Sequence, residues 1–184
     1  MRMRHSEGLG NLSVDFANTE ACPACRVGDA LASFRAAMIW RRFRPDLPPI
    51  ARSAATLTSL RGFRDDLRSV FAATIGKRRP PDPLVDRLNR SLRSAPSHLE
   101  VRVRLGQLTL LEVQAYGAPE NLWISAIVRS TFEVIGAAPP HQLRRCQGPG
   151  CVHYVIARTN RQLWCSPTGC GNRVRVARHY WKER

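Results

Sequence analysis

The chain has 184 residues, of which 43% are hydrophobic and 23% charged, a composition that is typical of globular proteins and excludes an intrinsically disordered chain. This length favours one domain, or one domain plus a small module. The formal net charge of +15 points to an anionic partner: nucleic acid, a membrane surface or an acidic protein. Residues 141–184 carry nine basic and one acidic side chain, a net +8, against a net +7 over residues 1–140.

The sequence shows no targeting or membrane-spanning segment. The segment Met1–Gly10 has no apolar core behind its arginines, so we expect no secretory signal. The longest apolar stretch, around Leu122–Val128, is too short to cross a bilayer. We therefore expect a cytoplasmic protein, associated with the nucleoid, in which cysteine pairs are metal sites before they are disulfides.

Residues 1–138 contain more helical than strand-like patterns. Alternating apolar and polar residues predict a strand at 11–16, and a second alternating stretch predicts a hairpin within 96–115. Apolar residues at spacings of three and four predict the helices. The predicted helices span residues 29–43, 50–75, 84–92 and 119–135.

These elements predict an α+β fold with two parts. A mixed, helix-rich N-terminal domain with a short hairpin occupies residues 1–138, and a small treble-clef-type zinc finger occupies residues 139–184. The Ala-Ala-Pro-Pro stretch at 137–140 is the best candidate for the linker between them.

Four cysteines near the C-terminus have the spacing of a zinc site. Cys146 and Cys151 form one C-x4-C pair, and Cys165 and Cys170 form a second pair thirteen residues later. Two short pairs around a connector of this length suit tetrahedral coordination by four thiolates. Because four thiolates close the coordination sphere, we expect one structural Zn²⁺ and no vacancy for His153.

The segments around these cysteines fit the same interpretation. The connector is strand-like at 152–157 and can return at 162–164, which predicts a hairpin. Ser166 can cap, and Pro167 can begin, a helix that runs to about Trp181 and holds the last cysteine in its first turn. A turn, a hairpin and a helix around one zinc ion describe a treble-clef-type finger.

The motif at residues 170–173 reads CGNR, and with Trp164-Cys165-Ser166 ahead of it the segment resembles the zinc finger of the CGNR family. In that family the finger follows a domain called ABATE, which the N-terminal part resembles through residues 12–19 (LSVDFANT). The resemblance covers essentially the full length and is strongest over residues 146–173. It implies a bacterial DNA-binding transcription regulator linked to stress, with the four cysteines as ligands.

The predicted last helix has a basic face. Basic side chains recur at i, i+3, i+4 and i+7 from Arg175 to Lys182, and two arginines lie at the predicted hairpin tip. Such a surface suits phosphate binding, and Arg and Asn are the residue types that read guanine and adenine edges. Asn172 and Arg173 have a structural alternative, since both can hydrogen-bond within the finger. The candidate nucleic-acid contacts are Arg158, Arg161, Asn172, Arg173, Arg175, Arg178 and Lys182.

A further pair, Cys22-Pro-Ala-Cys25, lies in a predicted loop. It could be half of a second zinc site, a redox pair or two unrelated thiols. Since no further cysteine pair is free to complete a second four-thiolate site, and no β-α-β pattern supports a thioredoxin-like protein, we expect neither a metal-binding nor a catalytic role for it.

Polar residues at the end of the predicted first strand could line a ligand pocket, or could cap turns instead. This ligand-binding candidate consists of Asp15, Asn18 and Thr19. The sequence lacks a phosphate-binding glycine loop, an H-E-x-x-H motif and a G-x-S-x-G motif, so we do not expect an enzyme.

The sequence therefore predicts a zinc-dependent transcription regulator whose finger binds double-stranded DNA and whose N-terminal domain senses a ligand or partner. Two alternatives stay open: a zinc-braced protein-interaction module that recruits an acidic partner, and an RNA-binding protein. A small-molecule effector would fit the regulator, and the symmetry of many operators suggests a homodimer. No membrane partner is expected.

Overall fold

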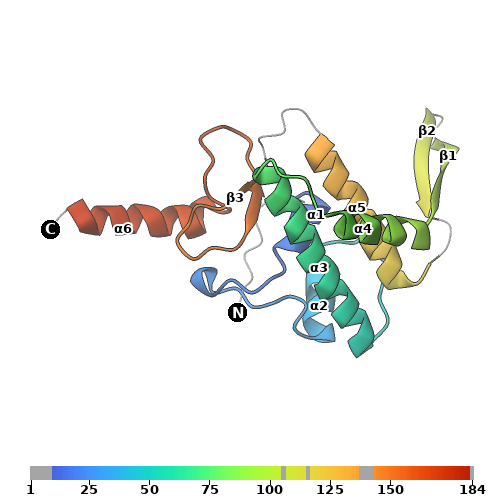
Figure 1. Cartoon of the computed structure of the whole chain (residues 1–184), viewed down its shortest axis with the longest axis horizontal. Coiled ribbons are helices and arrows are strands. Elements are labelled where there is room, and N and C mark those ends of the chain that lie inside the picture. Colours follow the sequence, from blue (N-terminus) through green and yellow to red (C-terminus); the bar gives the residue numbers. More distant parts are fainter. Residues whose placement is uncertain (1–9, 105–106, 115–116, 137–142, 183–184) are drawn as a thin grey trace.

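The computed structural model describes residues 10–104, 107–114, 117–136 and 143–182. Its helices pack into a body, from which the last helix projects at one end and a two-stranded hairpin at the other (Figure 1). The predicted α+β class is confirmed, and the predicted linker at 137–140 lies outside the described residues. The elements in chain order are α1 (Leu12–Ala17), η1 (Pro23–Cys25), α2 (Phe34–Arg41), α3 (Ala54–Ile75), α4 (Asp82–Ser94), β1 (Ser97–Arg104), β2 (Gln107–Gln114), α5 (Pro119–Gly136), β3 (Leu143–Arg145), β4 (Tyr154–Ile156), η3 (Pro167–Gly171) and α6 (Asn172–Lys182).

The first element is a helix, α1, so the predicted strand at 11–16 is wrong. Asn11 caps the helix, because its side-chain oxygen accepts a hydrogen bond from the backbone N–H of Ser13 at 3.0 Å. Every residue of α1 except Asp15 is buried. A short helix that is buried on all sides shows no 3.6-residue period, so its apolar residues imitate the alternation of a strand.

The longer helices follow the sequence pattern. The helix α3 begins after Ser53, whose hydroxyl accepts the N–H of Thr56 at 3.0 Å, four residues later than predicted. Helix α2 also begins late, because its N-cap is Ser33 and not Asp29. Helices α4 and α5 match the predictions to within two residues at each end. None of the helices in the described ranges combines the length and apolarity that a bilayer crossing needs.

Aromatic side chains join the helices into one core. Phe16 of α1 lies between Trp40 of α2 and Phe63 of α3, with ring centroids 5.8 Å apart in each pair. Trp40 also packs on Trp123 of α5 at 5.7 Å, and the Trp123 indole N–H donates to the Pro48 carbonyl at 2.7 Å. The short helix α1 is therefore packed against α2 and α3, and the loop that follows it starts from the core.

A buried ion pair fixes the far end of that loop. Arg64 of α3 donates to both carboxylate oxygens of Asp29, at 2.8 and 2.9 Å. Burial raises the pKa of Asp29, but the bonds from Arg64 and from the Leu31 N–H outweigh it, and the pKa lies below its ordinary value. Asp29 is thus engaged away from the helix end, which explains why Ser33 caps α2 in its place. The loop at 20–29 is held at both ends.

The predicted hairpin is present as β1 and β2, which pair antiparallel with Val103 opposite Leu108. Val101, Val103 and Leu108 lie on the same face and are 67%, 70% and 77% exposed. On the other face, Glu100 accepts hydrogen bonds from Arg102. The hairpin therefore presents one apolar face to solvent.

The hairpin of the finger differs from the prediction. The strand β4 pairs with β3, which precedes Cys146, so the first cysteine pair lies in the connection between the two strands. Residues 162–164 were predicted to be the return strand but are irregular, held to the first pair by the Leu163 carbonyl, which accepts the Gln147 N–H at 2.9 Å. The partner strand was missed because three residues are too short to show a period.

The finger hairpin belongs to the main hydrophobic core. Leu143 and Tyr154 are buried among the residues of the helical body, and the Tyr154 ring packs edge-on against Phe71 of α3 at 5.2 Å. Asn18, after α1, pairs with the backbone of Tyr154: its amide donates to the carbonyl at 2.9 Å and its oxygen accepts the N–H at 2.7 Å. The finger is thus attached to the N-terminal part along β4.

Candidate metal centre

All six cysteines of the chain converge at the junction of the finger and the N-terminal part, and none forms a disulfide. The Sγ atoms of Cys151 and Cys165 are 3.8 Å apart, and those of Cys165 and Cys170 are 3.6 Å apart. Cys25 reaches the same group, with its Sγ 3.5 Å from Cys151 and 3.6 Å from Cys170. These four sulfurs all lie within 4.8 Å of one another.

These distances fit a zinc centre. A Zn–S bond of about 2.3 Å gives sulfur atoms about 3.8 Å apart at the corners of a tetrahedron, and the four sulfur–sulfur distances above lie between 3.5 and 3.8 Å. All-thiolate donors favour Zn²⁺ over the harder cations Mg²⁺ and Ca²⁺. The four residues that meet this geometry therefore fit a closed, structural zinc site. They are Cys25, Cys151, Cys165 and Cys170, so Cys25 stands where the sequence predicts Cys146.

Cys146, the first predicted ligand, lies beside this group of four and accepts two backbone hydrogen bonds. Its Sγ accepts the N–H of Gly148 at 3.4 Å and of Cys165 at 3.3 Å. Hydrogen bonds from the Cys151 and Cys165 thiols and from these N–H groups hold the pKa of Cys146 well below its usual range. The thiolate is the form that binds a metal, so the local hydrogen bonds favour this residue as a ligand.

Glycines let the first cysteine pair turn tightly beside its neighbours. Gly150 has φ +67°, a left-handed conformation that favours glycine. A Cβ added at Gly148 would lie 3.0 Å from both Cβ and Sγ of Cys170. The turn Gly148-Pro149-Gly150 therefore permits close approach of the second pair.

The second pair leads into the last helix as predicted. The Ser166 hydroxyl caps the helical turn η3 by accepting the Gly169 N–H at 3.1 Å, and Pro167 is its first residue. Cys170 lies in this turn and is buried. Helix α6 continues directly from η3, so the metal centre sets the position of the helix start.

The Cys22–Cys25 pair is the part of the centre that the sequence did not predict. The pair forms the tight turn η1, and in Figure 1 this blue loop lies beside the finger. Besides the contacts of Cys25, the Sγ of Cys22 is 4.0 Å from that of Cys151. The C-x-x-C spacing was the available signal, but no pattern shows that residues 120 or more positions apart meet.

The candidate nucleic-acid contacts fall into two groups. Arg173 points back to the centre, with its guanidinium 3.4 Å from the Cys170 Sγ and 3.3 Å from the Pro149 carbonyl, which is the structural alternative foreseen for it. The Arg175 guanidinium donates to the Pro167 carbonyl at 3.1 Å while the side chain stays exposed. Lys182 is the last residue of α6. The other exposed candidates are Arg158, Arg161, Asn172 and Arg178.

The three ligand-binding candidates take part in contacts within the chain. Asp15 is 3.2 Å from the guanidinium of Arg44, and Asn18 pairs with Tyr154 as described above. Thr19 is buried, and its hydroxyl donates to the Phe16 carbonyl at 2.7 Å. Of the three, Asn18 joins the end of α1 to the finger, while the contacts described for Asp15 and Thr19 lie within the N-terminal part.

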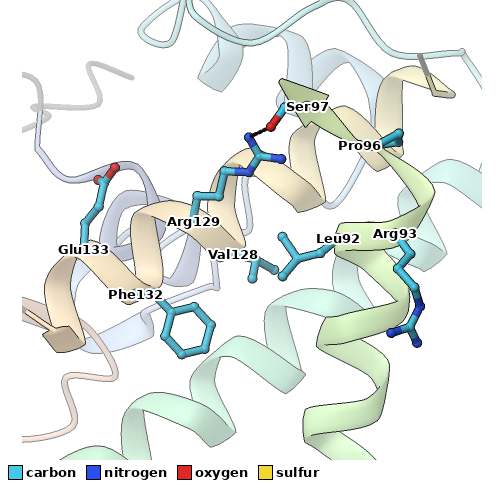
Figure 2. Close-up of a pocket in the computed structure, with 8 residues that line it drawn as sticks. All are labelled: Leu92, Arg93, Pro96, Ser97, Val128, Arg129, Phe132 and Glu133. Carbon is cyan, nitrogen blue, oxygen red and sulfur yellow. Dashed lines mark hydrogen bonds between the residues drawn. The ribbon is translucent and has the colours of Figure 1, made fainter. Parts of the chain in front are cut away.

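A hollow lies elsewhere, between the end of α4, the start of β1 and α5, with a volume of about 840 Å³. Figure 2 shows Leu92 and Val128 pointing toward one another at its floor, with Phe132 beside them. Arg129 crosses to Ser97, donating to its hydroxyl at 2.7 Å. None of the residues that line this hollow belongs to the cysteine centre.

Comparison with known families agrees with this architecture. Residues 10–137 match the ABATE family model, described as "Putative stress-induced transcription regulator", and residues 142–183 match the model of the CGNR zinc finger. No curated protein matched the chain. The cysteine centre is accordingly the structural zinc site of a CGNR finger. The chain belongs to the ABATE family and carries a CGNR zinc finger.

Proposed function

We propose that this protein is a transcription regulator, not an enzyme, that binds double-stranded DNA through α6 and the basic residues of its zinc finger. The observation that carries the proposal is the exposure of α6, since every residue from Arg175 to Tyr180 is exposed. The helix is basic, and the turn η3 that leads directly into it holds Cys170 of the metal centre. A rigidly anchored, basic helix has the dimensions that the major groove admits.

Charge and position both favour the part of α6 beyond Arg173 as the DNA contact. Arg173 is held against the Cys170 sulfur and supports the centre, while Arg175 and Arg178 are exposed further along the helix. Their side chains can reach phosphates or guanine edges without disturbing the zinc site. Arg158 and Arg161 add positive charge in the loop that precedes the second cysteine pair.

The proposal predicts how affinity depends on salt. The logarithm of the affinity should fall linearly with the logarithm of salt concentration, with a slope of about 0.9 per neutralised phosphate. We expect Arg175→Ala and Arg178→Ala each to flatten this slope by about one unit. Fluorescence anisotropy of zinc-loaded protein on labelled duplexes, from low to physiological salt, measures the slopes.

The matched control is Arg90→Ala, an exposed arginine of α4 on the N-terminal part, which should leave the slope unchanged. Unchanged slopes in both α6 variants would remove this helix from the interface. Equal binding to every nucleic acid that disappears at moderate salt would favour the protein-interaction module, and a preference for single strands would favour an RNA-binding protein.

We infer that the N-terminal domain responds to a partner through the hollow of Figure 2 and not through Asp15, Asn18 and Thr19. The hollow has an apolar floor and is open to solvent, so it suits the side chains of a partner or one face of a ligand. The Asn18 contact with Tyr154 would carry a shift of α1 to the finger. A photo-crosslinker placed at Phe132 should capture an effector or partner, and capture at Asp15 in its place would contradict this assignment.

The proposal includes a homodimer that forms through hairpin β1–β2. The exposed apolar face of Val101, Val103 and Leu108 would be covered by a second copy. We expect Val103→Glu to convert a dimer to a monomer in multi-angle light scattering, while Arg102→Gln on the opposite face leaves the mass unchanged. A monomeric wild-type chain at tens of micromolar would contradict the dimer.

A further inference from the structure

The metal centre has more donors than one zinc ion can use. A tetrahedral ion takes four ligands, and the finger supplies four cysteines, yet two further thiols and one imidazole lie against them. The described residues contain a second compact group of donors, all within 4.8 Å of one another: Cys22, Cys25, Cys151 and His153. Two tetrahedral ions that share one thiolate need seven ligands, which is the number available here.

Cys25 and Cys151 belong to both compact groups, and Cys151 is the one that is also a cysteine of the finger. Its Sγ is 3.8 Å from that of Cys165 on the finger side, and 3.5 and 4.0 Å from those of Cys25 and Cys22 on the loop side. These distances surround the edge of about 3.8 Å expected for a zinc tetrahedron. A thiolate sulfur has lone pairs enough to bind two ions, so Cys151 can bridge.

The imidazole of His153 gives independent evidence for a bound metal ion. Its Nε2 atom is buried and has no hydrogen-bond partner, and a ring nitrogen lies within 4.8 Å of the three sulfurs. A buried ring nitrogen without a partner needs an explanation, and a metal ion bound by the imidazole would supply it.

The loop that carries Cys22 and Cys25 is built to present both thiols together. The N–H and carbonyl of Cys22 both bond Val27, at 2.9 and 3.1 Å, and the Cys25 N–H bonds the Cys22 carbonyl at 2.9 Å. The turn closes with Arg26 at φ 56°, a left-handed conformation that is unfavourable for a residue with a side chain. A metal ion that requires the two thiolates side by side would maintain such a turn.

We propose that Cys22, Cys25 and His153, with Cys151 as a shared thiolate, hold a second Zn²⁺ beside the ion of the finger. The first ion would take the four cysteines of the finger, with Cys146 in the place that Cys25 holds in the compact group of the structure. Two Zn²⁺ and six thiolates leave a charge of −2, and the guanidinium of Arg173, 3.4 Å from the Cys170 sulfur, lies where it offsets part of that charge. The second ion would attach the N-terminal part to the finger, independently of whether α6 binds DNA.

The test is the number of metal ions in the full-length chain. We expect about two zinc ions per chain in protein purified under reducing conditions, measured by mass spectrometry of the metal against quantified protein. Cys22→Ser/Cys25→Ser and His153→Gln should each lower the content to about one. His98→Gln, a histidine on the exposed hairpin, is the matched control and should retain about two.

Cadmium substitution tests the shared sulfur. The ¹¹³Cd spectrum should show two resonances, one for an all-sulfur site and one for a site with three sulfurs and one nitrogen, coupled to each other through Cys151. The Cys22→Ser/Cys25→Ser variant should keep only the all-sulfur resonance, which also shows that the finger remains folded. One metal ion in the reduced wild-type chain, whichever cysteines hold it, or two uncoupled resonances, would overturn the proposal.

Discussion

Removal of zinc is expected to unfold the finger while leaving the helical body folded. Zinc in small fingers contributes an apparent binding free energy on the order of 10–16 kcal/mol, and residues 158–182 have few buried side chains besides the cysteines. With a strong chelator, or in Cys165→Ser, we expect η3 and α6 to lose their structure. The measurement is circular dichroism together with hydrogen exchange resolved along the sequence.

The structure indicates which segments of the finger should stay folded when zinc is removed. Leu143 and Tyr154 are buried in the main core, so β3 and β4 should keep part of their protection after the metal is removed. Thr168→Ser, an exposed position between Cys165 and Cys170, is the control and should behave like the wild type. Zinc added back to the chelated protein should restore α6, and a metal-free chain with unchanged protection over 158–182 would contradict a structural role for the ion.

How far the sequence predicted the fold depends on the length of each element. Helix α3 buries a stripe of apolar residues over 22 positions, and such a stripe is visible as a period of three and four. Helix α1 has six residues and is buried on nearly all sides, so its pattern carries no period and was misinterpreted as a strand. The strand β3 has three residues and was missed for the same reason.

The candidate site, like the fold, was predicted only in part. Spacing alone identified two cysteine pairs of one finger, because ligands on a single short module must follow a local geometry. Cys22 and Cys25 lie more than a hundred positions from Cys151 in the sequence. They reach it only because α1, the Asp29–Arg64 pair and β4 pack together. Packing of this kind leaves no local trace in the sequence, and the same holds for the buried Nε2 of His153.

Two contacts of the finger, one in the hydrophobic core and one in the cysteine cluster, change the expected picture of a finger joined to a separate domain by a linker. The finger hairpin shares the hydrophobic core of the helical body, and a loop of that body takes part in the cysteine cluster. What projects is α6, with Arg175 and Arg178 on its exposed length. The N-terminal part is therefore coupled to the turn η3, which leads into α6, by direct contact between Cys25 and Cys170.

Arg68 of α3 is the side chain that should matter most for this coupling. Its guanidinium donates to the Ala17 carbonyl at 2.8 Å and to the Val152 carbonyl at 2.9 Å. It also pairs with Glu20 at 2.6 Å and lies over the Tyr154 ring at 5.0 Å. One cation thus joins the end of α1, the cysteine loop and the strand that follows the first cysteine pair.

We expect Arg68→Met, which keeps much of the apolar stem but removes the guanidinium, to lower the free energy of unfolding by about 3 kcal/mol or more. Each hydrogen bond to a charged group contributes about 1.5–3 kcal/mol, and the two carbonyls lose their donor. For a chain of this size the melting temperature should fall by roughly 6–12 °C. Differential scanning calorimetry of the zinc-loaded protein measures the change.

The segment in which hydrogen exchange rises distinguishes a loss of coupling between the helical body and the finger from a general loss of stability. Arg61→Met removes guanidinium bonds to the Leu31 and Ala32 carbonyls, which lie within the N-terminal part, so it should lower stability without loosening the finger. Arg68→Met should in addition raise hydrogen exchange at 152–157. If exchange there stays at the wild-type rate while the melting temperature falls, Arg68 stabilises the helical body alone, and the coupling must rest on Asn18 and the cysteine cluster.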